Sequence, residues 1–184
     1  MKFIHMSDLH LGSPFAGLSA EEAARRYDSQ FSVLDAVLRK AASMKIGLVL
    51  ISGDVFDDIV VSQKTVSGFF RRLAGYPGIS FVISPGNHDY YTPEGYYSGA
   101  GIPENVFIFR SDELTKFEFP ELGADVYGFA FTSDSKFGPP ALIPDDGAFD
   151  GDDDPVADRC ITVVGTAKHT DAKDFLSTAV VGNR

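Results

Sequence analysis

The chain has 184 residues, 44% of them hydrophobic, which is enough for one domain with a sizeable core. Its 16 basic and 26 acidic residues give a formal net charge of −10, the opposite of the basic footprint expected for binding nucleic acid by charge alone. The single cysteine, Cys160, excludes an internal disulfide and cysteine-based zinc sites. The first residues are too polar for a signal peptide, and no apolar run approaches the ~20 residues of a membrane span. We therefore expect a soluble cytoplasmic protein.

The first half of the chain alternates strand and helix patterns. Three short runs are predicted to be buried strands: residues 2–6, 46–52 and 79–84. Residues 46–52 are apolar at both odd and even positions, as expected for a strand covered on both faces in a parallel sheet. A capping box of Ser19 and Glu22 opens a helix of roughly 20 to 25 residues, with apolar positions at spacings of three and four. A second helix is predicted over about 62–74. The order is therefore β-α-β-α-β.

Beyond residue 100 the pattern changes to short strands without a long helix between them: residues 106–109, 115–119, 125–131 and 160–164. A second sheet packed beside the first is the simplest account. Between Asp145 and Asp158 there are seven aspartates in fourteen positions and no basic residue, which is typical of a solvated loop. We expect residues 1–184 to form a single α/β domain with this acidic loop.

Polar side chains follow each strand of the first half, where the carboxyl ends of parallel strands converge on one crevice. They are Asp8 and His10, then Asp54 and Asp57, then Asn87, His88 and Asp89. In extended chain, residues i and i+2 face the same way, so Asp8 and His10 can hold one ion while Leu9 turns toward the core. Asp54 on the middle strand can bridge two ions, and the Asn87 amide oxygen suits the second. Mixed oxygen and imidazole ligands favour manganese, iron or zinc over calcium.

Three ordered motifs, each after a buried strand, resemble the first three motifs of the calcineurin-like metallophosphoesterases. They are Asp8-Leu9-His10, Gly53-Asp54-Val55-Phe56-Asp57 and Gly86-Asn87-His88-Asp89. The opening MKFIHMSDLHLGSPF is also similar to the DNA-repair exonuclease branch of that family, the SbcD-like nuclease subunits. The resemblance covers about residues 1–131.

The resemblance implies an αββα sandwich with a dinuclear metal site, in which Asp8 and His10 hold one ion and Asp54 bridges both. Asn87 would hold the second ion, and His88 would protonate the leaving group or steady the phosphoryl oxygens. Two ions ~3.5 to 4 Å apart would activate water and neutralise the phosphate. Manganese is the first candidate metal, with iron or zinc as alternatives. The implied substrate is DNA or a nucleotide phosphodiester, and the implied partner is an ATPase subunit.

Two carboxylates of these motifs have open roles. Asp57 can orient a metal-bound histidine, or it can be a carboxylate at the start of a helix. Asp89 can orient His88 as part of the catalytic group, which is the role we expect, or it can cap the next turn. The tyrosines that follow in residues 90–97 can stack unpaired bases or pack a glycine-rich loop against the core, and we expect packing.

The histidines are too few for the family pattern, in which a complete site uses five. This chain has four: His5, His10, His88 and His169. His5 lies inside the first strand, where packing or support of a ligand is the expected role, so only His169 is left for three places. We therefore predict an incomplete metal site and part of the C-terminal strands missing. A truncated chain, a shifted reading frame or a degenerate homologue would each give this pattern.

The first functional hypothesis is a metallophosphoesterase that hydrolyses phosphodiester bonds at DNA ends. A phosphodiesterase or phosphatase acting on a small nucleotide is the alternative that the acidic charge favours. A catalytically silent interaction module is the alternative that the missing histidines favour. A basic strip beside Asp54 would support DNA, and its absence would favour the small substrate.

Overall fold

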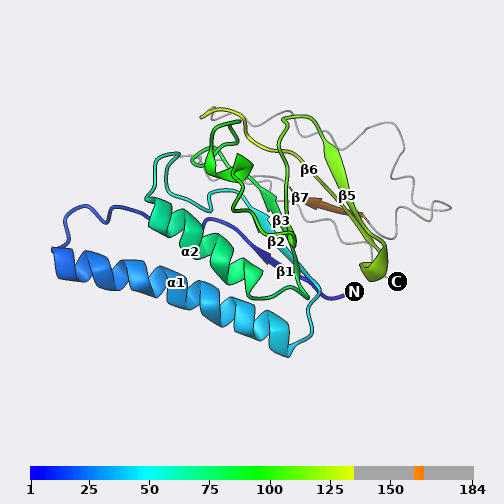
Figure 1. The fold of residues 1–184 in the computed structure, drawn as a ribbon, viewed down its shortest axis with the longest axis horizontal. Helices are drawn as coiled ribbons and strands as arrows, with labels where there is room; N and C mark the ends of the chain where they lie inside the picture. The colour runs from blue at the N-terminus through cyan, green and yellow to red at the C-terminus, as the bar shows by residue number, and fades with distance from the viewer. Residues whose placement is uncertain (135–159, 164–184) are drawn as a thin grey trace, which may run out of the picture.

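The computed structural model describes residues 1–134 and the backbone of residues 160–163, and its centre is a four-stranded parallel sheet (Figure 1). The strands are β1 (Ile4–Met6), β2 (Leu48–Ser52), β3 (Ser80–Ser84) and β4 (Val106–Ile108), in spatial order β1-β2-β3-β4. The helices α1 (Ala20–Ser43) and α2 (Gln63–Ala74) lie on one face of this sheet (Figure 1). The predicted β-α-β-α-β order is confirmed.

A second sheet contains β5 (Thr115–Phe119), β6 (Ala124–Gly128) and β7 (Cys160–Val163). In this sheet β5 is antiparallel to β6, whereas β7 is parallel to it. Short 3-10 turns follow β3 and β5, namely η1 (Tyr96–Ser98) and η2 (Pro120–Leu122). The mixed α/β architecture is therefore confirmed, with a helical layer and two sheets. The acidic stretch at 145–158 and His169 lie outside the described residues.

Alternate residues of β2 supply two separate cores, as the two-residue period of a strand requires. Val49 and Ile51 belong to the core between the sheet and the helices, together with Leu34 and Leu38 of α1. Leu48 and Leu50 belong to the core between the two sheets, which also contains Val82, Phe119 and Val126. Burial on both faces explains why β2 has no polar alternation in its sequence.

The caps of both helices are formed as the sequence indicates. Ser19 Oγ accepts from the Glu22 amide, and the Glu22 carboxylate accepts from the Ser19 amide at 3.0 Å, so the capping box is complete. Ser62 Oγ accepts from the Thr65 amide at 3.1 Å and begins α2. Within the described residues, no helix has the length and apolar character needed to cross a membrane.

Candidate metal centre

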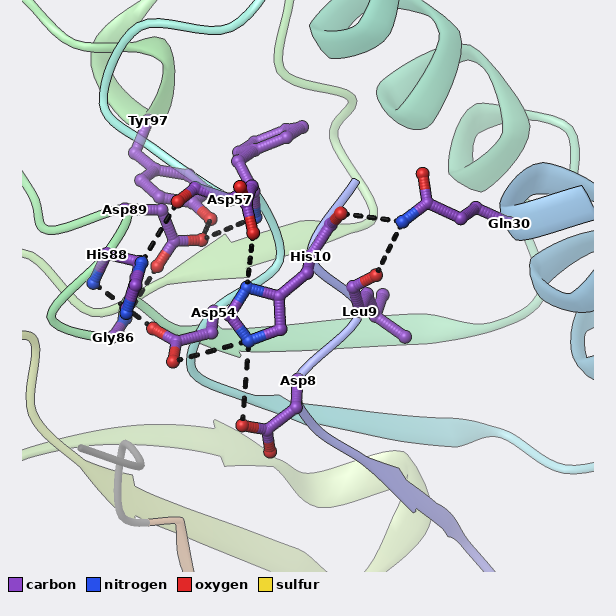
Figure 2. A network of polar contacts seen from close by, with 11 residues as sticks. Asp8, Leu9, His10, Gln30, Asp54, Asp57, Gly86, His88, Asp89 and Tyr97 are labelled. Atoms are coloured by element: carbon purple, nitrogen blue, oxygen red, sulfur yellow. Dashed lines mark hydrogen bonds and ion pairs between the residues drawn. The ribbon is translucent and has the colours of Figure 1, made fainter. Parts of the chain in front are cut away.

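The carboxyl ends of β1 and β2 bring three of the predicted ligands together. One ligand atom from each of Asp8, His10 and Asp54 lies within 4.8 Å of the other two. His10 Nε2 lies 4.0 Å from Asp8 Oδ1 and 3.9 Å from Asp54 Oδ2 (Figure 2). An imidazole nitrogen and two carboxylates around one point are a donor set that fits manganese, iron or zinc.

Asp57 holds the other side of the His10 ring. Its Oδ1 lies 3.0 Å from His10 Nδ1, as a close contact that does not have hydrogen-bond alignment. The contact keeps Nδ1 occupied by a carboxylate and leaves Nε2 directed at Asp8 and Asp54. Of the two roles open to Asp57, the structure therefore favours orientation of the histidine, an arrangement common among metal-bound histidines.

The backbone at the three residues is left-handed, whereas extended chain was expected at Asp8 and His10. The φ angles are 56° at Asp8, 43° at His10 and 51° at Asp54. The expectation of extended chain is wrong, because a turn rather than a strand carries these side chains to one point. Leu9 does pack against the helix-side core, as expected. A left-handed non-glycine residue costs roughly 1 to 2 kcal/mol, and such strain gathers at functional sites.

Hydrogen bonds between the two loops hold this conformation. The His10 amide donates to the Asp54 carbonyl at 2.9 Å, and the Leu11 amide donates to the Val55 carbonyl at 2.8 Å. The Asp8 amide donates to the Gly53 carbonyl at 3.2 Å. The loop after β1 is therefore fixed to the loop after β2 through its N–H groups.

Asp54 is completely buried, and only one of its oxygens has a hydrogen-bond donor. Asp54 Oδ1 accepts from the His88 amide at 3.2 Å, whereas Oδ2 has no hydrogen-bond partner in the described part of the chain. Burial raises the pKa of Asp54 to about 6, and the charge of Asp89 adds to the rise. A buried carboxylate oxygen without a donor is a position that a cation would satisfy.

Asn87 adds a second unpartnered oxygen at the same edge of the sheet, after β3. Its Oδ1 is buried and accepts no hydrogen bond from the described residues. The place of Asn87 in the ligand set stays a prediction, which this unpaired oxygen supports. The two orphaned oxygens and the His10 imidazole fit divalent ions of the type that the sequence predicts.

Gly86 allows the loop after β3 to approach Asp54. A Cβ atom at this position would lie 2.2 Å from Asp54 Oδ1 and 2.5 Å from the Asp54 amide nitrogen, so no side chain fits. From the sequence, Gly86 was identified only as part of a motif. Its position directly after a strand and before Asn87 and His88 is the sequence signal for this role, because a glycine there often marks a close approach of two backbone segments.

His88 lies beside His10, with the ring centroids 5.3 Å apart in an edge-to-face arrangement. Its Nδ1 lies 3.0 Å from the Asp57 carbonyl. Because a carbonyl only accepts, Nδ1 carries a hydrogen in this contact, and Nε2 is the atom left to give or accept a proton. His5 does not join this cluster, since its Nε2 lies 2.8 Å from Ser52 Oγ on the neighbouring strand.

Asp89 is buried and supports the loops. Its Oδ1 accepts from the Gly86 amide at 2.8 Å, and its Oδ2 accepts from the Phe56 amide at 3.1 Å and from the Tyr97 hydroxyl. Burial raises the pKa of Asp89. The Asp57 carbonyl contacts the His88 ring, and the hydrogen bonds of Asp89 go to backbone amides and to Tyr97. The place of Asp89 in the catalytic group stays a prediction.

The tyrosines after Asp89 pack as predicted where the structure shows their contacts. Tyr97 is 1% exposed, and its contact with Asp89 was not foreseen from the sequence. Tyr96 accepts from the Val61 amide at 3.0 Å and donates to the Asp58 carbonyl at 2.8 Å. These two residues connect η1 to the loops around the site, so neither is a free platform for stacking bases.

Comparison with known proteins agrees with this geometry. The sequence model of the calcineurin-like phosphoesterase family matches residues 1–157. The uncharacterized metallophosphoesterase YhaO of Bacillus subtilis is 34% identical over 140 residues, which are 71% of this chain and 34% of that protein. The DNA double-strand break repair protein Mre11 of Nanoarchaeum equitans is 30% identical over 129 residues, which are 68% of this chain and 32% of that protein.

A third relative is a subunit of the SbcCD nuclease of Rhodobacter capsulatus. It is 30% identical over 93 residues, which are 48% of this chain and 22% of that protein. The chain thus spans about a third or less of the length of each of these relatives.

Proposed function

The chain belongs to the calcineurin-like phosphoesterase family, and we propose that it hydrolyses phosphodiester bonds with the help of two divalent metal ions, manganese foremost. The observation that carries this proposal is the set of unsatisfied ligand atoms at one sheet edge. Asp54 Oδ2 and Asn87 Oδ1 are buried without partners among the described residues, and His10 Nε2 is directed at Asp8 and Asp54.

In this proposal Asp8 and His10 would hold one ion, Asn87 would hold the other, and Asp54 would contribute to both. When bound, the ions supply an activated water and neutralise the phosphate charge during in-line attack. Asp57 keeps the His10 ring in place through its 3.0 Å contact with Nδ1. The left-handed backbone at Asp8, His10 and Asp54 brings their side chains together, and this arrangement would preorganise the site for the ions.

His88 is proposed as the residue that protonates the leaving group or steadies the phosphoryl oxygens. The Asp57 carbonyl fixes the hydrogen on Nδ1, so Nε2 is the atom that can exchange a proton with the substrate. The His88 amide also binds Asp54 at 3.2 Å, which ties the position of this ring to the proposed bridging carboxylate.

The proposed substrate is a DNA end, and the support is similarity to two proteins whose names describe a nuclease subunit and a break-repair protein. One of these is by name a subunit of a larger nuclease, which supports the further proposal of an ATPase partner. The matched residues cover 22% and 32% of the length of these two relatives. The DNA substrate and the ATPase partner are therefore proposals, which experiments must test.

A small nucleotide is the second candidate substrate, favoured by charge. The chain has a net charge of −10, and within the described residues the ion pairs of Asp54 involve no lysine or arginine. Seven basic side chains lie along the helices, and of these Arg26 lines a groove that Asp8 also lines: Arg25, Arg26, Arg39 and Lys40 on α1, with Lys64, Arg71 and Arg72 on α2. A small phosphodiester does not need the basic groove that a DNA duplex needs.

The test is manganese-dependent hydrolysis of a chromogenic phosphodiester at high protein concentration. We expect slow turnover that Asp54→Asn abolishes and that Asp58→Asn, a change at an exposed neighbouring aspartate, leaves unchanged. End-labelled DNA and a dinucleotide are then compared by kcat/KM, and the better substrate decides between the two candidates. Manganese binding without any hydrolysis would overturn the proposed activity and favour an interaction module.

A further inference from the structure

Gln30 is a residue of α1 that reaches the candidate metal centre, and the chemistry proposed above gives it no role. Its Nε2 donates to the His10 carbonyl at 2.7 Å and has a longer contact of 3.5 Å with the Leu9 carbonyl. Figure 2 shows Gln30 on one side of His10, with Asp54 and His88 on the other. The helix therefore contacts the ligand-bearing segment from behind.

The segment that Gln30 contacts is the strained one. Asp8 and His10 have φ angles of 56° and 43°, so the backbone at both would relax if it were free. Their amides are held by carbonyls of the loop after β2. On the carbonyl side, the His10 oxygen accepts from Gln30 at 2.7 Å and from the Ser13 amide at 3.3 Å. Gln30 thus makes the shorter of these two contacts.

Leu9 packs against the core on the side of α1, but packing between the segment and the helix is incomplete. A groove of about 390 Å³ lies between residues 6–15 and the helix, and its lining includes Leu9, Gln30 and Val33. Because this space is not filled by side chains, the segment has room to shift toward the helix. The amide of Gln30 spans from the helix to the backbone of the segment and restrains that shift.

Within the part of the chain that the structure describes, only one of the two polar atoms of the Gln30 amide is satisfied. Its Oε1 is buried and has no hydrogen-bond partner in the described residues. Leaving a buried acceptor unpaired opposes folding, and methionine, an apolar side chain of equal length, would avoid that penalty. What methionine would lack is the N–H donor to the carbonyls of Leu9 and His10.

We propose that Gln30 is a positioning residue of the metal centre, which holds the Asp8–His10 turn through its carbonyls so that both side chains face one ion. The inference rests on the proposed function, in that Asp8 and His10 are taken as ligands. Gln30 does not touch the ion. It acts through the backbone, in the manner of the supporting partners that tune metal affinity.

The experiment is calorimetric titration of the full chain with manganese alone. Gln30→Met removes the donor, and Gln63→Met is the matched control at the exposed first residue of α2. We expect Gln30→Met to weaken manganese binding about tenfold, at the lower end of the ~10- to 100-fold effects of supporting residues, and Gln63→Met to change it less than about twofold. Urea unfolding of each metal-free variant gives the folded fraction on which affinity is calculated.

The Gln30→Glu variant distinguishes a positioning role of residue 30 from a direct effect of its charge on manganese binding. An added negative charge near a cation site would tighten manganese binding by Coulomb attraction, whereas a carboxylate cannot donate to the two carbonyls. We expect binding weaker than that of the parent. Tighter binding by Gln30→Glu, or binding by Gln30→Met within twofold of the parent, would overturn the inference and leave the proposed function intact. A parent chain that does not bind manganese would instead overturn the proposed function itself.

Discussion

β2 and the loop that follows it are both buried, yet burial of the strand and burial of the loop have opposite effects on the stability of the fold. All five residues of β2 are buried, and its backbone pairs in register with β1 and β3. Residues 53–56 are buried as well, but they include two left-handed residues and a carboxylate with a raised pKa. Burial of the strand stabilises the fold, whereas burial of Asp54 opposes it. The sheet holds the loop in a state that the loop would not adopt alone.

The largest expected effect lies in the strand. Leu50 is fully buried between the two sheets, so Leu50→Ala should lower the free energy of unfolding by about 2 to 5 kcal/mol. Manganese affinity, corrected for the folded fraction, should stay within twofold of the parent. Urea unfolding and calorimetry measure the two quantities. A large loss of affinity in folded Leu50→Ala would show that strand and loop are not separable.

The opposite change is expected in the loop. The pKa of Asp54 rises from 3.8 to about 6 on folding, so its ionisation destabilises the metal-free fold as pH rises from about 4 to 6, and that stability stays lost above pH 6. Asp54→Asn removes the charge and should raise the free energy of unfolding by up to about 3 kcal/mol at pH 8, with little effect at pH 3. Manganese binding should be lost.

The measurement is urea unfolding of the metal-free parent and variant across this pH range. If Asp54→Asn is less stable than the parent at pH 8, burial of this carboxylate does not oppose folding, and the contrast between strand and loop is wrong. An Asp54→Ala variant that binds manganese as well as the parent would exclude the bridging role.

A third test asks whether the site residues after β1, β2 and β3 are sufficient for catalysis. Since the chain has four histidines and only His169 is spare, the second ion would lack ligands, and turnover should fall far below the ~10 s⁻¹ of a typical enzyme. His88→Ala should lower this slow turnover further in the chromogenic assay with manganese, because the substitution removes the proposed proton donor. Rapid turnover that His88→Ala abolishes would mean that His169, Asn183 or a neighbouring subunit completes the site.

The smallest effect is expected for DNA binding. A chain with a net charge of −10 repels the duplex, and two divalent ions return only a charge of about +4 locally. At ~0.15 M salt we expect a Kd for duplex DNA weaker than about 10⁻⁴ M, and weaker binding still as salt rises. A gel-shift series measures it, and micromolar binding would reveal a basic groove that the net charge conceals.

The helices and strands were predictable because they follow from the periodicity of apolar residues. The convergence of the proposed ligands was predictable because it follows from the parallel sheet. Apolar runs placed β2 and β3, and the convergence of strand ends placed Asp8, His10 and Asp54 together. The left-handed backbone at these residues was not predictable, since aspartate and histidine are compatible with many conformations. It depends on contacts with a loop some 45 residues away in the chain, such as that of the His10 amide with the Asp54 carbonyl.

Two supporting residues were not predictable for a related reason. Gln30 stands in an amphipathic helix where periodicity identifies apolar positions but not the target of a polar side chain. Tyr97 was one of several tyrosines in a loop, and only the fold selects it as the donor to Asp89. Asp89 itself was identified by its motif, but its contacts depend on three segments that only the folded chain brings together.

The contact between Tyr97 and Asp89 gives the protein a native optical reporter. The chain has no tryptophan, and burial beside Asp89 raises the pKa of Tyr97 well above its ordinary value. In alkaline solution, exposed phenols therefore ionise first, while Tyr97 stays neutral for as long as the loops around Asp89 remain closed. Burial also raises the pKa of the neighbouring Tyr96, which belongs to the same turn η1. The delayed part of the phenolate absorbance thus records the opening of the loops around η1, without a label and without any change to the sequence.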